Sequence, residues 1–285
     1  MQYEAPVSVK EATQLLAKAK GPAKILAGGT DLLVQMRAGA VAPALIVDVK
    51  EIKEMRTVTA DKGGFRIGAA VSGAELGENA KVQKMWPGVV EALELIGSTQ
   101  IQGRASLGGN LCNASPAADS VPAMIAARVT CTIVGPNGRR TVAVEKIITG
   151  PGKTSLKKGE IIVAFNLPKQ KARSGDAYLR FIPRTEMDIA VVGAGINLTI
   201  DRKGVCTDAR VTLGAVAPRP LLVKAAANTL IGSTLDEAAM AKLDAAAQAA
   251  CNPIDDKRGT IEYRTKVAGV LARRAAAIAA ERAGA

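Results

Sequence analysis

Two short glycine-rich segments are the residues of this sequence best suited to holding a charged ligand. The first glycine-rich segment reads A-G-G-T-D-L, residues 27–32, and the second glycine-rich segment reads S-L-G-G-N-L, residues 106–111. Because glycine has no Cβ, such turns can direct backbone N–H groups at an anion. Together they could bind the two phosphates of a dinucleotide, although for the glycines alone ordinary turns are the simpler interpretation.

Two other polar groups have a functional and a structural interpretation. Asp119 could bind a hydroxyl-rich ligand, but its position alone favours the N-cap of a helix over residues 120–128. Arg184, Glu186 and Asp188 are typical of a solvated turn before a strand. None of these residues indicates a site by itself.

Two further glycine motifs only imitate nucleotide-binding signatures. Residues 150–154, G-P-G-K-T, end like a P-loop but lack its first glycine and lead into a turn. Residues 193–195, G-A-G, lie inside a β run without the third glycine of G-x-G-x-x-G. We expect a turn and a packed strand there.

Composition excludes several classes of chemistry. The 285 residues contain no histidine, so there is no Ser-His-Asp triad, histidine base or histidine metal ligand. The cysteines at 112, 131, 206 and 251 form no C-x-x-C pair, which argues against an iron–sulfur or zinc site and suits a reducing cytoplasm. We therefore expect no catalytic residue and no metal ligand in this chain, and chemistry performed by a bound cofactor.

The charge and hydropathy favour a protein that neither binds nucleic acid nor contains a membrane-spanning segment. The formal net charge is +12, but the 38 basic residues are spread along the chain and aromatic residues make up only 2%. An anionic cofactor or an acidic partner explains this charge equally well. We find neither a transmembrane segment nor a signal peptide, and we expect the chain in the cytoplasm, the inner face of the membrane included.

Hydrophobic periodicity predicts the elements that must position the glycines. We expect helices over residues 8–20, 86–96, 235–250 and 261–283, and strands over 24–27, 44–49, 65–69, 130–134, 140–144, 161–167, 190–200 and 209–216. A charged, apolar-poor linker is expected over 169–176. These patterns predict an α+β domain over residues 1–174 and a smaller sheet-and-helix domain over 175–285.

Nine further motifs occur in a characteristic order along nearly the whole chain. They are Y-E-A-P-V-S-V-K-E-A from Tyr3, L-A-G-G-T-D-L-L from Leu26 with Met36-Arg37, L-I-V-D from Leu45, S-L-G-G-N-L-C-N-A-S-P-A-A-D from Ser106, G-K-T from Gly152, G-E-I-I from Gly159, R-T-E-M-D-I-A from Arg184, R-G-T-I-E-Y-R from Arg258 and L-A-R-R from Leu271. In this order they resemble the FAD-binding medium subunit of the molybdenum hydroxylases, the family of xanthine and carbon monoxide dehydrogenases.

The resemblance implies a fold and a set of cofactor contacts. The fold would be a two-lobed FAD-binding domain of the vanillyl-alcohol-oxidase/PCMH type, followed by a three-stranded antiparallel sheet with helices. FAD, held non-covalently, would contact two loops, with the ribose at an Asp, the adenine side at an aliphatic residue and the flavin carbonyl at a basic residue. On this sequence these positions are Leu26, Ala27, Gly28, Gly29, Thr30, Asp31 and Leu32, then Ser106, Gly108, Gly109, Asn110, Asn113 and Ser115, then Asp119 (ribose), Ile162 (adenine) and Arg180 (flavin carbonyl).

The sequence departs from the family pattern at two places. Where the family reads Q-I-R-N before its second loop, residues 100–104 read Q-I-Q-G-R, so Arg104 could replace the missing charge. Ile96 stands near the position of an aromatic residue that stacks on the flavin in some members. The extra cysteine-rich loop of some relatives is absent from the sequence.

The function implied by the resemblance is electron transfer. The FAD of this chain would take electrons from two [2Fe-2S] clusters of a small subunit and pass them to NAD, quinone or oxygen. A large subunit with the molybdenum cofactor would oxidise the substrate, in a dimer of heterotrimers. The alternatives are a stand-alone flavin oxidoreductase of the same superfamily and a basic, non-enzymatic binding module.

Overall fold

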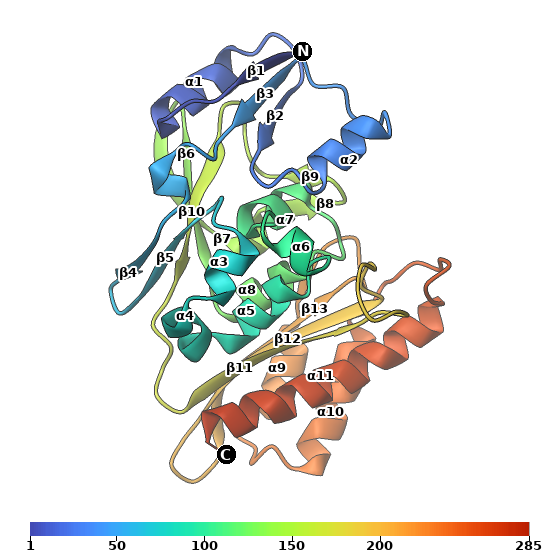
Figure 1. Ribbon diagram of the computed structural model, residues 1–285. Coiled ribbons are helices and arrows are strands. Elements are labelled where there is room, and N and C mark those ends of the chain that lie inside the picture. The colour runs from blue at the N-terminus through green and yellow to red at the C-terminus, as the bar shows by residue number, and fades with distance from the viewer. Residues whose placement is uncertain (285) are drawn as a thin grey trace.

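The first lobe is a small parallel sheet covered by one helix. The computed structural model describes residues 1–284, and its first sheet has the strand order β1-β3-β2. The strands are β1 (Gln2–Glu4), β2 (Ala23–Leu26) and β3 (Leu45–Asp48). Helix α1 (Val9–Lys18) begins at Ser8, whose side chain accepts a hydrogen bond from the Glu11 N–H at 3.2 Å. The short helix α2 (Leu32–Arg37) stands at the end of the first glycine-rich segment (Figure 1).

The second lobe is built on a five-stranded antiparallel sheet of order β4-β5-β10-β6-β7. Its strands are β4 (Val58–Asp61), β5 (Gly64–Gly68), β6 (Thr130–Gly135), β7 (Gly138–Ala143) and β10 (Ile161–Leu167). The helices between β5 and β6 are α3 (Gly73–Gly77), α4 (Ala80–Met85), α5 (Pro87–Glu94), α6 (Thr99–Gln102), α7 (Leu107–Asn113) and α8 (Ser120–Ala126). A small hairpin, β8 (Ile148–Gly150) and β9 (Lys153–Thr154), completes the lobe.

The C-terminal part is an antiparallel sheet of order β11-β12-β13-β14. The long strands β11 (Ser174–Phe181), β12 (Val192–Ile200) and β13 (Cys206–Gly214) confirm the predicted three-stranded sheet, and the two-residue β14 (Leu221–Leu222) extends its edge. Helices α9 (Lys224–Leu230), α10 (Glu237–Ala249) and α11 (Ile261–Ala283) cover one face, while α5 and α8 of the second lobe lie on the other (Figure 1).

Small buried side chains allow this close packing. Ala268, Ala272, Ala275 and Ala279 recur every three or four residues along α11, and each is fully buried against the sheet. A Cβ at Gly195 would lie 3.0 Å from the Pro122 backbone. Residue 195 must therefore be glycine for α8 to pack this closely on the strand. The predicted strand at residues 193–195 is thereby confirmed.

The linker predicted over residues 169–176 is wrong at its C-terminal end. Strand β11 already begins at Ser174, and Asp176 is buried between α5 and α11. The polar composition hid this strand because its burial comes from helices distant in sequence. The apolar side chains form two clusters, one in the two lobes and one in the C-terminal part. The domain division between residues 174 and 175 stays a prediction.

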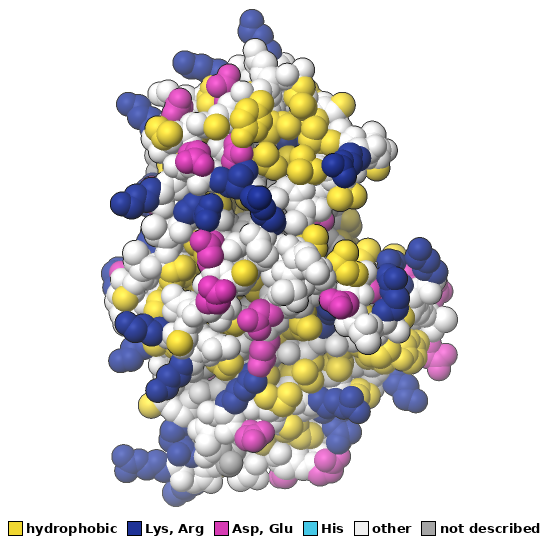
Figure 2. Space-filling model, viewed as in Figure 1, with side chains coloured by type: hydrophobic (Ala, Val, Ile, Leu, Met, Phe, Trp, Pro, Cys, Tyr) yellow, Lys and Arg dark blue, Asp and Glu magenta, His cyan; other side chains and the backbone are white. Residues whose placement is uncertain are grey.

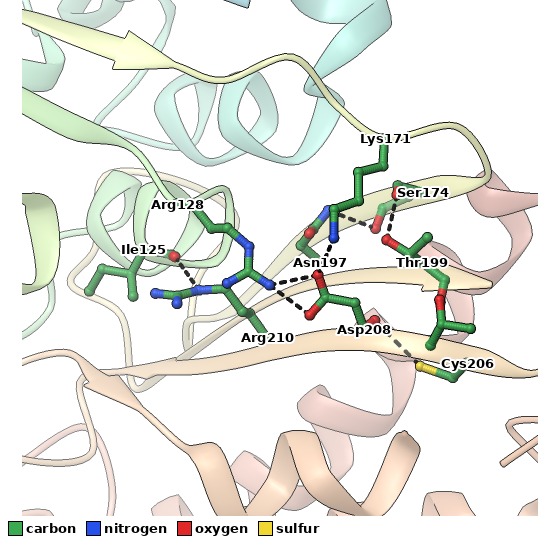
Figure 3. A network of polar contacts seen from close by, with 11 residues as sticks. Ile125, Arg128, Lys171, Ser174, Asn197, Thr199, Cys206, Asp208 and Arg210 are labelled. Carbon is green, nitrogen blue, oxygen red and sulfur yellow. Dashed lines mark hydrogen bonds and ion pairs between the residues drawn. The ribbon is translucent and has the colours of Figure 1, made fainter. Parts of the chain in front are cut away.

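A polar network joins the second lobe to the C-terminal sheet (Figure 3). Arg128, just after α8, donates to both carboxylate oxygens of Asp208 on β13, at 2.7 and 2.8 Å. Lys171 adds a third contact to Asp208 at 2.9 Å, and Arg210 donates to the Ile125 carbonyl at 2.9 Å. These contacts fix α8, and with it the segment that precedes it, on the C-terminal sheet.

Candidate functional site

A cavity of about 370 Å³ lies between the first lobe and helix α7. This volume is within the range of about 300–1,000 Å³ common for small-molecule sites. Twelve of the predicted contact residues line it, namely Ala27, Gly28, Gly29, Thr30, Asp31, Leu32, Ser106, Gly108, Gly109, Asn110, Asn113 and Ile162. The structure thus brings the two glycine-rich segments together, although they are far apart in the sequence.

The first glycine-rich segment is an open turn between β2 and α2. At Gly28 a Cβ would stand 1.8 Å from the Arg104 carbonyl oxygen, so the backbone of this segment is in direct contact with the backbone just before the second segment. Gly29 has a φ of +79°, a conformation that favours glycine. Within residues 1–284, the N–H groups of residues 28–31 have no hydrogen-bond acceptor. These donors are available to an anion, and their contact with FAD stays a prediction.

The second glycine-rich segment has a different structure, because its glycines form the first turn of helix α7. The Ser106 side chain caps this helix by accepting from the Gly109 N–H at 3.1 Å. The Gly108 N–H donates to the Ala69 carbonyl at 3.1 Å, and a Cβ at Gly108 would lie 2.4 Å from that oxygen. The prediction that both glycine amides face an anion is therefore wrong here, since protein acceptors already engage them.

Two asparagine side chains of α7 face the cavity with their orientation fixed by neighbours. The Asn110 Oδ1 accepts from both the N–H and the hydroxyl of Ser120, at 3.2 and 2.7 Å. The Asn113 Oδ1 accepts from the Gln35 Nε2 at 2.9 Å. Because each carbonyl oxygen is engaged, each amide group has its N–H donors left for a ligand.

The remaining walls are largely apolar. Ile96, Ile161 and Ile162 line the cavity, and the roles of Ile96 at the flavin and Ile162 at the adenine stay predictions. Cys112 also lines the cavity and is exposed there, and desolvation raises the pKa of its thiol. This wall suits the planar, apolar face of an aromatic ligand.

The charged side chains among the lining residues are Lys24 and Asp31. Their formal charges cancel, and partial burial raises the pKa of the Asp31 carboxyl. A dianionic diphosphate in this cavity would therefore depend mainly on backbone N–H groups. Sequence reasoning missed Lys24, Gln35 and Gly152 as lining residues, because only the fold brings them to the cavity.

Asp119 and Arg180 contact each other. The Arg180 guanidinium donates to the Asp119 carboxylate at 3.0 Å and the Tyr178 hydroxyl donates to it at 3.1 Å. Burial raises the pKa of Asp119 to about 6, although Arg180 and Tyr178 oppose this. Burial is also the main cause that raises the pKa of Tyr178.

The predicted helix cap at Asp119 is wrong. Asp119 has helical backbone angles and makes no capping hydrogen bond to α8 within the described chain, because its side chain turns to β11 instead. Asp119, Arg180, Leu26 and Ser115 do not belong to the cavity wall in residues 1–284. Ser115 accepts a hydrogen bond from the Ala117 N–H at 3.2 Å. The roles of these four residues toward FAD stay predictions.

The other motifs have structural roles. The G-K-T stretch of residues 152–154 forms the turn and second strand of the β8–β9 hairpin, and its Gly152 reaches the cavity rim. Asp188 does not sit in a merely solvated turn, because it binds Arg258 at 2.9 Å and Arg184 at 3.2 Å. These contacts lower the pKa of the Asp188 carboxyl to about 2.

Two searches of residues 1–284 for other kinds of site gave negative results. This part of the chain holds no group of three or more His, Cys, Asp or Glu side chains that could bind a metal ion. Among its helices, none has the length and hydropathy needed to cross a membrane. Lys and Arg side chains are scattered over the face shown in Figure 2, with Asp and Glu between them.

Family comparisons match this geometry over almost the whole chain. Residues 1–170 match the FAD binding domain in molybdopterin dehydrogenase, and residues 177–279 match the CO dehydrogenase flavoprotein C-terminal domain. The chain belongs to this family. It is therefore an FAD-binding oxidoreductase subunit of the molybdenum hydroxylase type, as the sequence motifs predicted.

Individual relatives agree with this assignment. The carbon monoxide dehydrogenase medium chain of Hydrogenophaga pseudoflava is 32% identical over 96% of this chain and 95% of its own length. The xanthine dehydrogenase FAD-binding subunit of Escherichia coli O157:H7 is 34% identical over 82% and 80%. A structure of CO dehydrogenase from Oligotropha carboxidovorans superposes with a TM-score of 0.95 at 32% identity, covering 99% of this chain and 98% of its own.

The residues present fit the family's FAD. The Gly28 backbone packs on Arg104 and the Gly108 backbone on Ala69, and neither contact admits a side chain. The free N–H groups of residues 28–31 suit a diphosphate, and the isoleucine wall suits an aromatic ring. The cavity thus has both polar and apolar parts, as a dinucleotide requires.

Proposed function

We propose that this chain is the FAD-carrying electron-transfer subunit of a heterotrimeric molybdenum hydroxylase. Bound FAD would supply the redox chemistry, accepting electrons from [2Fe-2S] clusters of a small subunit and delivering them to NAD, quinone or oxygen. The chain itself would bind and orient the cofactor. The observation that carries this proposal is the cavity between the two glycine-rich segments, with free backbone donors on one side and an apolar wall beside them.

Each part of the cavity has a defined role in this proposal. The N–H groups of residues 28–31 would donate to the diphosphate, and the side-chain amides of Asn110 and Asn113 would donate to polar atoms of FAD. Ile96 and Ile162 would cover the ring systems and exclude water from them. The contacts proposed for Asp119 at the ribose and Arg180 at the flavin carbonyl require FAD to reach beyond the cavity wall.

The names of the relatives support partner subunits. The Hydrogenophaga protein is a medium chain, and a relative from Paenarthrobacter nicotinovorans is a subunit of a 6-hydroxypseudooxynicotine dehydrogenase complex. We propose a large molybdenum-cofactor subunit, a small subunit with two [2Fe-2S] clusters and a dimer of such heterotrimers. A stand-alone flavin oxidoreductase would differ by turning over an acceptor without partner subunits.

Substitution of Gly109 tests the cofactor site directly. Gly109 lines the cavity, and a Cβ there would meet only the Ser106 hydroxyl, at 3.3 Å. In Gly109→Val the added methyl groups should enter the cavity and abolish FAD binding, with the C-terminal part still folded. The measurement is acid-released flavin per purified complex, together with circular dichroism and thermal unfolding.

Gly103→Val is the matched control, because Gly103 is exposed and its Cβ would have 3.8 Å to its nearest neighbour. This variant should keep its flavin. Full FAD content in Gly109→Val, or a colourless wild-type complex, would contradict the proposed function.

A further inference from the structure

Helix α2 is attached to the rest of the chain mainly through its ends. None of its six residues is buried, and Leu33 and Val34 are 44% and 63% exposed. Within residues 1–284, the contact from Gln35 to Asn113 is the only hydrogen bond made by a side chain of α2. A helix with so little buried surface is free to move relative to its surroundings.

The position of this hydrogen bond is more informative than its strength. Gln35 lies in the first lobe and Asn113 ends α7 in the second, 78 residues further along the chain. Both side chains line the cavity. The bond of 2.9 Å therefore spans from one wall of the cavity to the other.

The first glycine-rich segment also contacts the residues just before the second one. At Gly28 the backbone of the first segment packs on the Arg104 carbonyl, with no room for a Cβ. This contact is made by main-chain atoms on both sides and lacks a flexible side chain. The Gly28–Arg104 contact is thus a fixed point, whereas the Gln35–Asn113 bond can open by rotation of two side chains.

We infer that Gln35 and Asn113 form a latch that closes the α2 wall over the cofactor, which makes Gln35 a further positioning residue for FAD. Gln35 acts through Asn113, whose oxygen it engages and whose amide it thereby orients. Opening the latch lets α2 move away from α7 while the Gly28–Arg104 contact holds the first glycine-rich segment in place, so cofactor entry and exit both require it. This inference rests on the proposed function, in which the cavity binds FAD.

The latch makes a kinetic prediction that a direct contact to FAD does not make. In the complex carrying Gln35→Ala, FAD dissociation should accelerate about two- to ten-fold, the loss expected for one net hydrogen bond. FAD association to the stripped complex should also accelerate, because the barrier to opening is lowered. Stopped-flow flavin fluorescence measures both rates, and Gln14→Ala, an exposed glutamine on α1, is the matched control.

A double-mutant cycle with Asn113→Ala completes the test. If Gln35 acts through Asn113, adding Gln35→Ala to Asn113→Ala should change neither rate further. Faster dissociation with unchanged association, a further change in the double variant, or rates equal to the wild type would each overturn the latch. Failure of the wild-type complex to bind FAD would instead refute the proposed function, so the two failures are distinguishable.

Discussion

The two glycine-rich segments share a sequence pattern and line the same cavity, yet they contribute to it differently. The first is an open turn whose N–H groups at residues 28–31 have no acceptor within the described chain. The second is the first turn of α7, where Ala69 and Ser106 engage the N–H groups of Gly108 and Gly109. The first therefore supplies donors, whereas the second supplies a close wall and two oriented amide side chains. Two similar sequence motifs can thus contribute different groups to one site.

The largest expected effect is on FAD affinity, and it differs between a glycine of the first segment and a glycine of the second. Gly28→Ala places a methyl group 1.8 Å from the Arg104 oxygen, so the segments must separate. We expect FAD affinity to fall by more than about 100-fold, or roughly 3 kcal/mol, because the clash displaces the first segment and its donors from Arg104. Gly109→Ala, whose methyl group lies 3.3 Å from the Ser106 hydroxyl, should lose less than about three-fold by the same scale. Flavin titration of both stripped complexes measures this, and equal losses would refute the division of roles.

The folding stability should depend on pH through Asp119, which lies after the second glycine-rich segment. Folded Asp119 has its pKa raised from 3.8 to about 6, mainly by burial. The folded chain therefore binds this proton more tightly than the unfolded chain, and the resulting stabilisation is complete below pH 3.8 and lost as the pH rises toward 6. At about 1.36 kcal/mol per pKa unit, this change amounts to roughly 3 kcal/mol.

Asp119→Asn provides the comparison for that pH effect. The stability of the wild type minus that of the variant should decrease between pH 4 and pH 6, measured by urea unfolding across this interval. At every pH in this range the variant keeps a neutral group beside the buried Arg180 side chain. A difference that stays constant or increases with pH would show that Arg180 outweighs burial at Asp119.

The smallest effect compares the hydroxyl groups of the two segments. Ser106 caps α7, so Ser106→Ala should lower the free energy of unfolding by about 1 kcal/mol. Thr30 lies in the open turn without such a role, and Thr30→Ala should change it by less than about 0.5 kcal/mol. Chemical denaturation of both variants measures the difference, and similar values would mean that the two segments are structurally equivalent after all.

The sequence predicted the elements whose pattern is local. Helix α1 has its predicted cap at Ser8, and strands β10 and β12 have long apolar runs, so their positions followed from periodicity. The family motifs predicted half of the residues of the cavity wall, because their order is characteristic. Even helix α7 carries a local signal, since Leu107 and Leu111 are four residues apart and both are buried.

The features that sequence reasoning missed depend on distant partners. Asp119 pairs with Arg180, 61 residues away, rather than capping α8. Gln35 reaches the cavity through Asn113, and β11 is buried by helices that precede and follow it. A single sequence contains no local pattern for such contacts, because they arise only when the lobes and the C-terminal sheet pack together.

The thiol of Cys112 gives this cavity an inherent chemical reporter. Cys112 opens into the cavity, whereas Cys131 and Cys206 are buried and Cys251 lies outside it. Because desolvation raises the pKa of its thiol, Cys112 should be alkylated faster in alkaline solution than at neutral pH, and a filled cavity should block the reagent. Cys251 serves as the internal reference in the same mass spectrum. Cofactor occupancy can then be followed by mass, independently of the colour contributed by the other redox centres of a complex.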